Sequence, residues 1–286
     1  MVSLIGPPNV GKSTLLNCLL GQKISIVSPK PQTTRNRILG IVNGPGYQIV
    51  MQDTPGLHKG TIPLNVEMAR IAMEALTEVD IIVFMVDASM PSPQPGSDLT
   101  ECLAGTRTPT ILVINKSDLL KHEKLLPLIE AYQGLHAFAA IIPLSARRAE
   151  GVNRLLSEII SLLPEGPRYF PDDIPTDATV RSIAGEIIRE KVFLLTGQEI
   201  PYSTAVVIDR FQETEELVTI DASIIVEKDS QKGMVIGKHG AKLKQIGTAA
   251  RIDIEELVQT KVMLKLWVKV QKNWTKDPRF LKELGF

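Results

Sequence analysis

A phosphate-binding loop occupies the start of the chain. Gly6 to Ser13 read Gly-Pro-Pro-Asn-Val-Gly-Lys-Ser, after the apolar residues 3–5 and before a helical run over 14–20. Backbone N–H groups of such a loop close around phosphate oxygens, Lys12 brings positive charge to the β- and γ-phosphates, and Ser13 offers its hydroxyl to Mg²⁺. The residues expected at the phosphates are Gly6, Pro7, Pro8, Asn9, Val10, Gly11, Lys12, Ser13 and Thr14.

A second motif is expected at the metal and the γ-phosphate. Asp53-Thr-Pro-Gly56 follows the apolar run 48–51. At this place in a phosphoryl-transfer site an Asp holds Mg²⁺ through water, and a glycine N–H faces the γ-phosphate. The predicted contacts are Asp53, Thr54, Pro55, Gly56 and the following Leu57.

Two short motifs indicate guanine. Asn115-Lys-Ser-Asp118 follows the apolar run 110–114, and Ser145-Ala-Arg147 follows the run 141–143. An Asp can accept hydrogen bonds from N1–H and the 2-amino group of guanine, whereas adenine has no 2-amino group and would leave a buried carboxylate unpaired. A backbone N–H of the second motif can reach guanine O6. The residues expected around the base are Asn115, Lys116, Ser117, Asp118, Ser145, Ala146 and Arg147.

A polar segment between the first two motifs is expected to be a switch. Residues 28–37 read Ser-Pro-Lys-Pro-Gln-Thr-Thr-Arg-Asn-Arg, which suits a loop that orders around Mg²⁺ and GTP. Thr34 is the first choice for the Mg²⁺ contact and Thr33 the second, so the predicted metal ligands are Ser13, Thr34 and Asp53. A second switch is expected over residues 57–63, with His58 and Lys59 facing solvent.

The elements that must position these motifs alternate between strand and helix. The predicted strands are residues 3–5, 48–51, 81–86, 110–114 and 141–143. Buried strands alternating with helices are typical of a parallel sheet covered on both faces, an α/β fold. Four prolines within residues 164–175 then interrupt the pattern. We expect a GTP-binding domain over residues 1–164, a Pro-rich linker over 165–177 and a second domain over 178–286.

Taken together, the motifs of residues 1–163 resemble the TRAFAC superfamily of GTPases, which implies a three-layer P-loop domain that hydrolyses GTP. Ras-like enzymes carry a water-orienting glutamine after Asp-x-x-Gly, but this chain has Leu57, which cannot orient water. Relatives with an Asn at the place of Asn9 use its amide oxygen to help place K⁺, so the hypothesis is slow, potassium-stimulated hydrolysis. An amide that only stabilises the loop is the alternative. The residues expected to act in hydrolysis are Asn9, Lys12, Thr34 and Gly56.

The second domain carries a Gly-x-x-Gly turn. Gly237-Lys-His-Gly240 lies between an apolar segment and a predicted helix over 241–258. The glycines let the backbone pass close to RNA phosphates, and nearby lysines add charge. The predicted order of helix 182–195, strands 204–210 and 218–227, a Gly-containing loop, helix 241–258 and strand 262–270 matches an α+β type II KH fold. The expected RNA contacts are Gly237, Lys238, His239, Gly240, Lys242 and Lys244.

Charge is unevenly distributed, although 32 basic residues balance 32 acidic ones overall. Residues 166–227 hold 5 Lys or Arg against 12 Asp or Glu, whereas residues 228–286 hold 13 against 6. The last predicted strand places Lys261, Met263, Lys265, Trp267 and Lys269 on one face. That face is either an extended RNA path or an ordinary solvated surface.

The whole chain resembles the Era family of bacterial GTPases, because few families join these two domains in this order. It departs from the family at Pro7, where Arg is frequent, and at His239, where Gly is usual. The resemblance implies GTP and GDP as ligands with Mg²⁺, and binding of small-subunit (16S) ribosomal RNA near its 3′ end. It also implies a role on the pre-30S particle in 30S assembly and peripheral contact with the inner face of the cell membrane. Separately, we expect a monomer, and the two cysteines and the short apolar runs favour a cytoplasmic location.

Two other functions stay open at this point. One is a constitutive RNA-binding assembly protein in which GTP is structural, which Leu57 keeps open. The other is a P-loop ATPase or kinase, which would leave Asp118 and Ser145 unexplained. The apolar runs fall short of the ~20 residues that span a bilayer. With only Cys18 and Cys102, a disulfide framework or zinc site is not expected.

Overall fold

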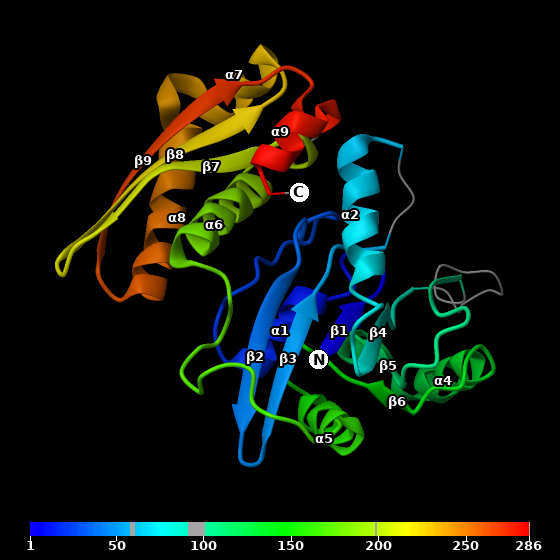
Figure 1. Cartoon of the computed structure of the whole chain (residues 1–286). Coiled ribbons are helices and arrows are strands. Elements are labelled where there is room, and N and C mark those ends of the chain that lie inside the picture. Colours follow the sequence, from blue (N-terminus) through cyan, green and yellow to red (C-terminus); the bar gives the residue numbers. More distant parts are fainter. Residues whose placement is uncertain (58–60, 91–100, 198, 286) are drawn as a thin grey trace. The chain divides into compact units, whose positions relative to one another are not determined.

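The chain separates into two compact units in the computed structural model, which describes residues 1–57, 61–90, 101–197 and 199–285 (Figure 1). The first unit is made of Met1–Ser25, Thr34–Gly60 and Asn65–Asp177. The second is made of Ile26–Thr33, Thr61–Leu64 and Ala178–Phe286. Most of the expected first switch therefore clusters with the C-terminal unit, although its sequence lies between two motifs of the N-terminal one.

The first unit contains a six-stranded sheet with the order β2-β3-β1-β4-β5-β6. Its strands are β1 (Val2–Ile5), β2 (Ile38–Gly44), β3 (Tyr47–Asp53), β4 (Ile81–Asp87), β5 (Thr110–Asn115) and β6 (Ala140–Pro143). All neighbours pair in parallel except β2 with β3. The carboxyl ends of the parallel strands therefore lie along one edge of the sheet, where the predicted motifs meet. Open α/β sheets bind their ligands at this edge.

Helices cover both faces of this sheet, which confirms the predicted three-layer α/β domain. The helices are α1 (Lys12–Leu20), α2 (Pro63–Glu74), α4 (Leu125–Gln133) and α5 (Val152–Leu162), with short turns η1 (Ser117–Leu119) and η2 (His122–Lys124). Leu15 of α1 and Leu155 of α5 share one core with the sheet, and Ala72 of α2 and Tyr132 of α4 share the other. Each fully buried aliphatic side chain contributes about 1.5–3 kcal/mol, so the two cores hold the loop-bearing strand ends in place.

Strand β2 was missed by the sequence analysis. Its glycines and Asn43 weaken β-propensity, but Ile41 and Val42 are buried and the strand pairs along its whole length with β3. The Pro-rich segment lies beside it, since the Ile41 N–H donates to Pro175 O at 2.8 Å and the Thr176 hydroxyl donates to Leu39 O at 2.6 Å. A segment with few backbone donors can follow such an edge without extending the sheet.

The second unit is a three-stranded sheet, β7-β8-β9, covered by helices. Its elements are α6 (Val180–Leu195), η3 (Ile200–Ser203), β7 (Ala205–Glu213), β8 (Leu217–Val226), α7 (Asp229–Ile236), η4 (Lys238–Gly240), α8 (Ala241–Val258), β9 (Lys261–Val270), η5 (Trp274–Lys276) and α9 (Pro278–Glu283). Strand β8 is antiparallel to β7 and parallel to β9. Close packing at Gly185 against Ile208 and at Gly247 against Leu266 sets α6 and α8 on the same sheet.

Helix α7 occupies much of the stretch between strand 218–227 and helix 241–258, where we predicted a Gly-containing loop, so that prediction was wrong for residues 229–236. Gly233 and the β-branched Val235 lower helix propensity. The helix is held instead by burial of Val235 and by Gln231, whose Oε1 accepts hydrogen bonds from the N–H groups of Glu227 and Lys228.

Among the described residues, no helix combines the length and the hydropathy needed to cross a membrane. Neither Cys18 nor Cys102 forms a disulfide bond.

Candidate nucleotide and RNA sites

The phosphate loop is shaped for an anion. Gly11 precedes α1 with φ 103°, and a Cβ on it would lie 2.2 Å from Asn115 Nδ2, so only glycine fits there. Lys12 Nζ donates to Gly6 O and Pro7 O, both at 2.9 Å. Burial lowers the pKa of Lys12 to about 8, against the opposing effect of the Asp53 charge. A polyanion bound at the loop would supply a negative counter-charge beside this buried ammonium group.

The three predicted metal ligands lie together in the first unit. Ser13 Oγ is 2.9 Å from Thr34 Oγ1 and donates to Asp53 Oδ2 at 2.6 Å. Ser25 Oγ, which the sequence analysis missed, also donates to this oxygen at 2.7 Å. Within the described structure Asp53 Oδ1 is buried without a hydrogen-bond partner. Hard oxygen donors around an unpartnered carboxylate oxygen fit Mg²⁺.

Burial raises the pKa of Asp53, and the hydroxyls of Ser13 and Ser25 and the Lys12 charge partly offset this. A divalent cation would favour the ionised form of the same carboxylate. The neighbouring Thr33 is used differently, because its hydroxyl donates to Lys30 O at 2.7 Å. The geometry therefore favours Thr34 over Thr33 as the threonine at the metal.

The Asp-Thr-Pro-Gly segment is fastened to the sheet and to the phosphate loop. Thr54 Oγ1 donates to Leu4 O at 2.7 Å, and the Leu57 N–H donates to Gly6 O at 3.0 Å. The Leu57 side chain is buried in the core with Ile5. It therefore offers nothing to an attacking water, as the sequence predicted. His58 and Lys59 of the expected second switch lie outside the described residues.

Asn115 joins the phosphate loop to the guanine motifs. Its Nδ2 donates to Val10 O at 2.7 Å, and its Oδ1 accepts from the Ala146 N–H at 2.9 Å. Both hydrogen bonds are buried, so the Asn115 side chain holds the phosphate loop and the loop of residues 145–147 in position. Its polar atoms are therefore used within the protein and do not read the base. Ser145 is likewise buried, with its N–H donating to Glu150 O at 2.9 Å, whereas Arg147 is exposed.

Two of the residues expected to read guanine, Lys116 and Asp118, have ionic partners that the sequence analysis missed. Lys116, at φ 62°, donates to Asp87 Oδ2 at 2.6 Å. Burial alone would raise the pKa of Asp87, but hydrogen bonds from Lys116 and Ser89 hold it below its ordinary value. Asp118 lies 3.5 Å from Arg148 Nε. Asp87 stands at the end of the predicted strand 81–86, which is the one signal that could have pointed to it.

The first switch is held by helix α6 inside the second unit. The Val27 N–H donates to Glu190 Oε1 at 2.9 Å, and Arg189 Nη2 donates to Thr33 O at 2.5 Å. Lys30 Nζ donates to the carbonyls of Phe193 and Thr196 at the C-terminal end of the helix. A cation at that end is favoured by the helix dipole and by charge-assisted hydrogen bonds. Nothing in the sequence predicted these contacts between the first switch and α6.

The Gly-x-x-Gly turn joins α7 to α8. Gly237 has φ 70° and ψ 175°, and a Cβ on it would lie 2.6 Å from Lys242 Cβ. Gly240 caps α8 in the left-handed region, while Lys238, His239 and Lys244 are exposed around the turn. The N-terminus of α8 thus faces solvent with basic side chains beside it, which favours phosphate.

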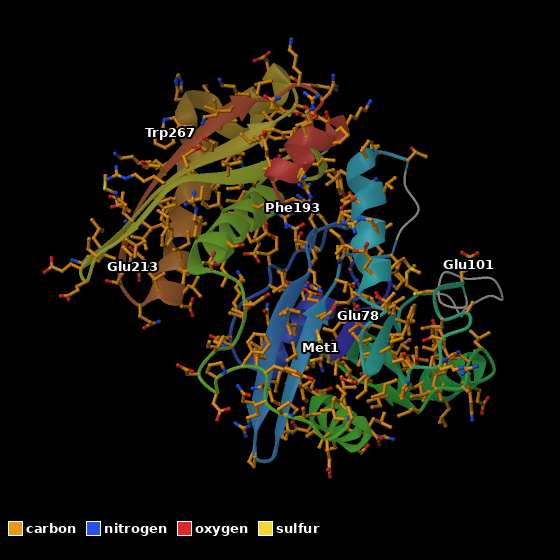
Figure 2. The ribbon with its side chains drawn as sticks, in the orientation of Figure 1. Met1, Glu78, Glu101, Phe193, Glu213 and Trp267 are labelled. Carbon is orange, nitrogen blue, oxygen red and sulfur yellow. The ribbon has the colours of Figure 1, made fainter. Side chains whose placement is uncertain are left out.

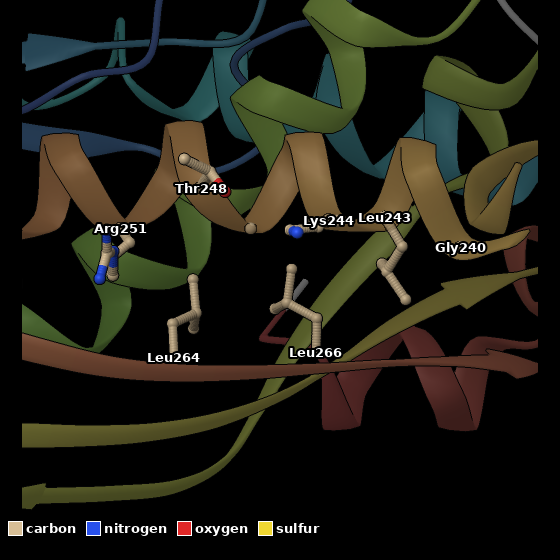
Figure 3. A pocket seen from close by; sticks show the side chains of 8 residues that line it. Gly240, Leu243, Lys244, Thr248, Arg251, Leu264 and Leu266 are labelled. Atoms are coloured by element: carbon tan, nitrogen blue, oxygen red, sulfur yellow. The ribbon is translucent and has the colours of Figure 1, made fainter.

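A cleft of about 450 Å³ runs beside this turn between α8 and β9 (Figure 3). Leu264 and Leu266 point from β9 toward the helix, and Lys244 and Arg251 come from α8. The full lining is Gly240, Leu243, Lys244, Gly247, Thr248, Arg251, Leu264 and Leu266. An apolar floor with cations along one wall suits unstacked bases and their phosphates. Arg251 was not among the predicted contacts.

Comparison with known proteins identifies the family. The family model described as 50S ribosome-binding GTPase matches residues 1–116, and the model described as KH domain matches residues 199–275. GTPase Era of Syntrophus aciditrophicus is 52% identical over all of this chain and 94% of its own length, and GTPase Era of Geobacter metallireducens is 53% identical over all of this chain and 96% of its own. The chain belongs to the Era family of GTPases.

Solved Era structures have the same fold. A variant of Aquifex aeolicus Era bound to GDP·AlF4⁻ matches with a TM-score of 0.95 at 39% identity, covering 99% of this chain and 97% of that one. Era in complex with MgGDPNP and nucleotides 1506–1542 of 16S ribosomal RNA matches with a TM-score of 0.95 at 40% identity and the same coverage. Era membership confirms the predicted GTP hydrolysis and both predicted folds, and it disfavours the ATPase or kinase alternative.

Proposed function

We propose that the chain is a GTP-hydrolysing switch that binds small-subunit ribosomal RNA near its 3′ end, and that its RNA affinity depends on the bound nucleotide while it acts in 30S assembly. The Era relative that binds both MgGDPNP and a 16S ribosomal RNA segment supports this choice of RNA. Mg²⁺ would be held by the hydroxyls of Ser13 and Thr34 and, through water, by Asp53.

The single observation that carries the switch is the division of the first switch loop between the two units. Ile26–Thr33 cluster with α6 in the second unit, and Thr34 lies beside Ser13 in the first unit. Two consecutive residues, Thr33 and Thr34, therefore contact the RNA-binding unit and the candidate metal site, respectively. A loop whose order depends on Mg²⁺ and GTP would change the contacts of α6 when GTP is hydrolysed. A constitutive RNA-binding protein would need no such contacts.

Lys30→Ala is expected to uncouple the two sites. Loss of its bonds to the carbonyls that end α6 should weaken the attachment of the loop to the helix, leaving the contacts of Val27 and Thr33. Coupling between two sites typically changes affinity by about 5- to 150-fold, so the ratio of RNA affinities between the GTP-analogue and GDP states should fall from that range toward one. The measurement is fluorescence anisotropy of labelled RNA in both nucleotide states.

Arg37→Ala is the matched control, because Arg37 is an exposed cation three residues beyond Thr34. It should keep the wild-type ratio. An unchanged ratio in Lys30→Ala would show that the contacts of Lys30 with α6 do not carry the coupling.

Asn9, Lys12, Thr34 and Gly56 are proposed to act in hydrolysis, and K⁺ is proposed to assist hydrolysis through Asn9. Asn9 has φ 59° at an exposed place in the loop, and Leu57 leaves the water-orienting role unfilled. A cation beside the β- and γ-phosphates would offset developing charge, so single-turnover hydrolysis should be about tenfold faster in K⁺ than in Na⁺. Asn9→Gly keeps the left-handed backbone without the amide and should show one rate in both salts. Equal wild-type rates in the two salts would contradict the proposal.

We propose that the protein acts as a monomer in the cytoplasm on the pre-30S particle. Peripheral contact with the inner face of the cell membrane is proposed on the family resemblance alone. Sedimentation with and without vesicles would test both the oligomeric state and the membrane contact.

A further inference from the structure

Strand β9 presents a row of exposed side chains on the face that points away from the cleft. Leu264 and Leu266 line the cleft, and alternate residues of a strand point to opposite faces. The other face holds Met263 and Trp267, 43% and 46% exposed, with Trp267 labelled in Figure 2. We call the row the β9 outer face: it consists of the exposed residues Lys261, Met263, Lys265, Trp267 and Lys269.

The β9 outer face itself carries three lysines and no acidic residue. Lys269 lies 3.5 Å from Asp209, and Asp221 of β8 stands in register beside Lys265. Within the described ranges, neither Lys261 nor Lys265 has an ion-pair partner within 4.0 Å. Two ammonium groups are thus available on the outer face for a polyanion.

Solvation of an edge strand does not account for the whole row. Because β9 is the last strand in the order β7-β8-β9, its lysines would discourage pairing with another chain. Met263 and Trp267 would instead favour pairing with another chain, because exposed apolar side chains on an edge strand promote it. The other tryptophan, Trp274, is fully buried and donates to Ser203 O at 2.9 Å. An indole left nearly half exposed between lysines is what a base-stacking surface requires.

We propose that the β9 outer face is a second RNA-contact surface, on which an unpaired base stacks on Trp267 and phosphates lie beside Lys261 and Lys265. The occupant is the single-stranded continuation of the RNA held in the cleft. The lysines make the outer face complementary in charge to RNA. Because β9 borders the cleft with one face and carries the lysines on the other, a single RNA strand can run from the cleft onto the outer face. The free edge of β9 lets the RNA pass from one face to the next. This inference rests on the proposed RNA-binding function.

RNA length separates the two surfaces experimentally. An RNA of about four nucleotides fills a Gly-x-x-Gly clamp, whereas one longer by about eight can also reach the outer face. Both are titrated at fixed salt against the full chain with a GTP analogue. Trp267→Ala is expected to weaken binding of the longer RNA by about tenfold. Lys261→Gln with Lys265→Gln should reduce its salt slope by about 1.4, that is about 0.7 for each lost phosphate contact. Binding of the shorter RNA should not change.

The matched control is Lys121→Gln with Lys124→Gln, which removes two exposed lysines from the first unit. Trp267→Phe should retain affinity for the longer RNA and lose the RNA-induced quenching of tryptophan fluorescence, because Trp274 is buried. Equal losses on both RNAs, or losses no larger than the control's, would overturn the inference. So would a loss of self-association in Trp267→Ala with unchanged RNA affinity, because it would assign the face to a second copy. If the wild type binds neither RNA, the proposed RNA-binding function fails with it.

Discussion

Asp118→Asn is expected to lower the affinity for GTP by about a thousandfold or more and to create affinity for xanthosine triphosphate. The Asp118 side chain is only 10% exposed and lies in η1, just after β5, whose last residue Asn115 holds the surrounding loops together. A carboxylate accepts two hydrogen bonds from guanine, whereas a carboxamide turns an NH₂ toward the 2-amino group. Xanthine has a carbonyl at that position, which accepts from the same NH₂.

Titration with fluorescent guanosine and xanthosine diphosphates measures this exchange. Arg148→Gln is the control, since it removes the 3.5 Å ionic neighbour of Asp118 and keeps the carboxylate. It should leave the preference for guanine intact. Equal weakening of both nucleotides by Asp118→Asn would mean that Asp118 supports the loop and does not read the base.

Gly237→Asp is expected to weaken RNA binding by about a hundredfold, because a carboxylate beside the α8 N-terminus repels the phosphates that the turn would hold. The new Cβ also meets Lys242 at 2.6 Å, in a backbone conformation that side chains rarely adopt. GTP hydrolysis measured without RNA should be unchanged. Electrophoretic mobility shifts at fixed salt measure the loss.

Two further variants separate charge from steric overlap. Gly240→Asp adds the same charge at a φ of 78°, also in the left-handed region, but no atom lies within 4 Å of the new Cβ; this variant should also lose RNA binding. Gly233→Asp, in α7 and equally open, should bind RNA nearly as the wild type does. Retained RNA affinity in Gly240→Asp would contradict the assignment of the turn as the RNA clamp.

The parts of the fold that the sequence predicts well are those with strong local constraints. The strands β1, β4 and β5 are largely apolar and buried because both faces are covered, and the motifs after β1 and β5 need particular side chains to meet phosphate or guanine. By contrast, β2 and α7 carry weak local preferences. They form because β3 supplies a pairing edge and because Val235 and Gln231 are buried by the rest of the second unit.

The missed site residues share a different cause. Asp87 and Arg148 act through partners 29 and 30 positions away in the chain, and Glu190 meets the Val27 N–H across 163 positions. No periodicity or motif encodes such pairs, since they are set by the order of strands and by which unit a loop joins. The residue types of the candidate metal ligands follow from phosphate chemistry, but a preference for Thr34 over Thr33 needs the position of the Ser13 hydroxyl, which only the structure gives.

The most direct test of the proposed switch is the affinity of the full chain for the 3′ tail of small-subunit ribosomal RNA, measured in GDP and in a non-hydrolysable GTP analogue. Salt must be the same in both titrations, because phosphate contacts make affinity steeply dependent on ionic strength. We predict at least about fivefold tighter binding with the GTP analogue. Equal affinity in the two states would contradict the switch and favour an RNA-binding protein in which GTP is structural.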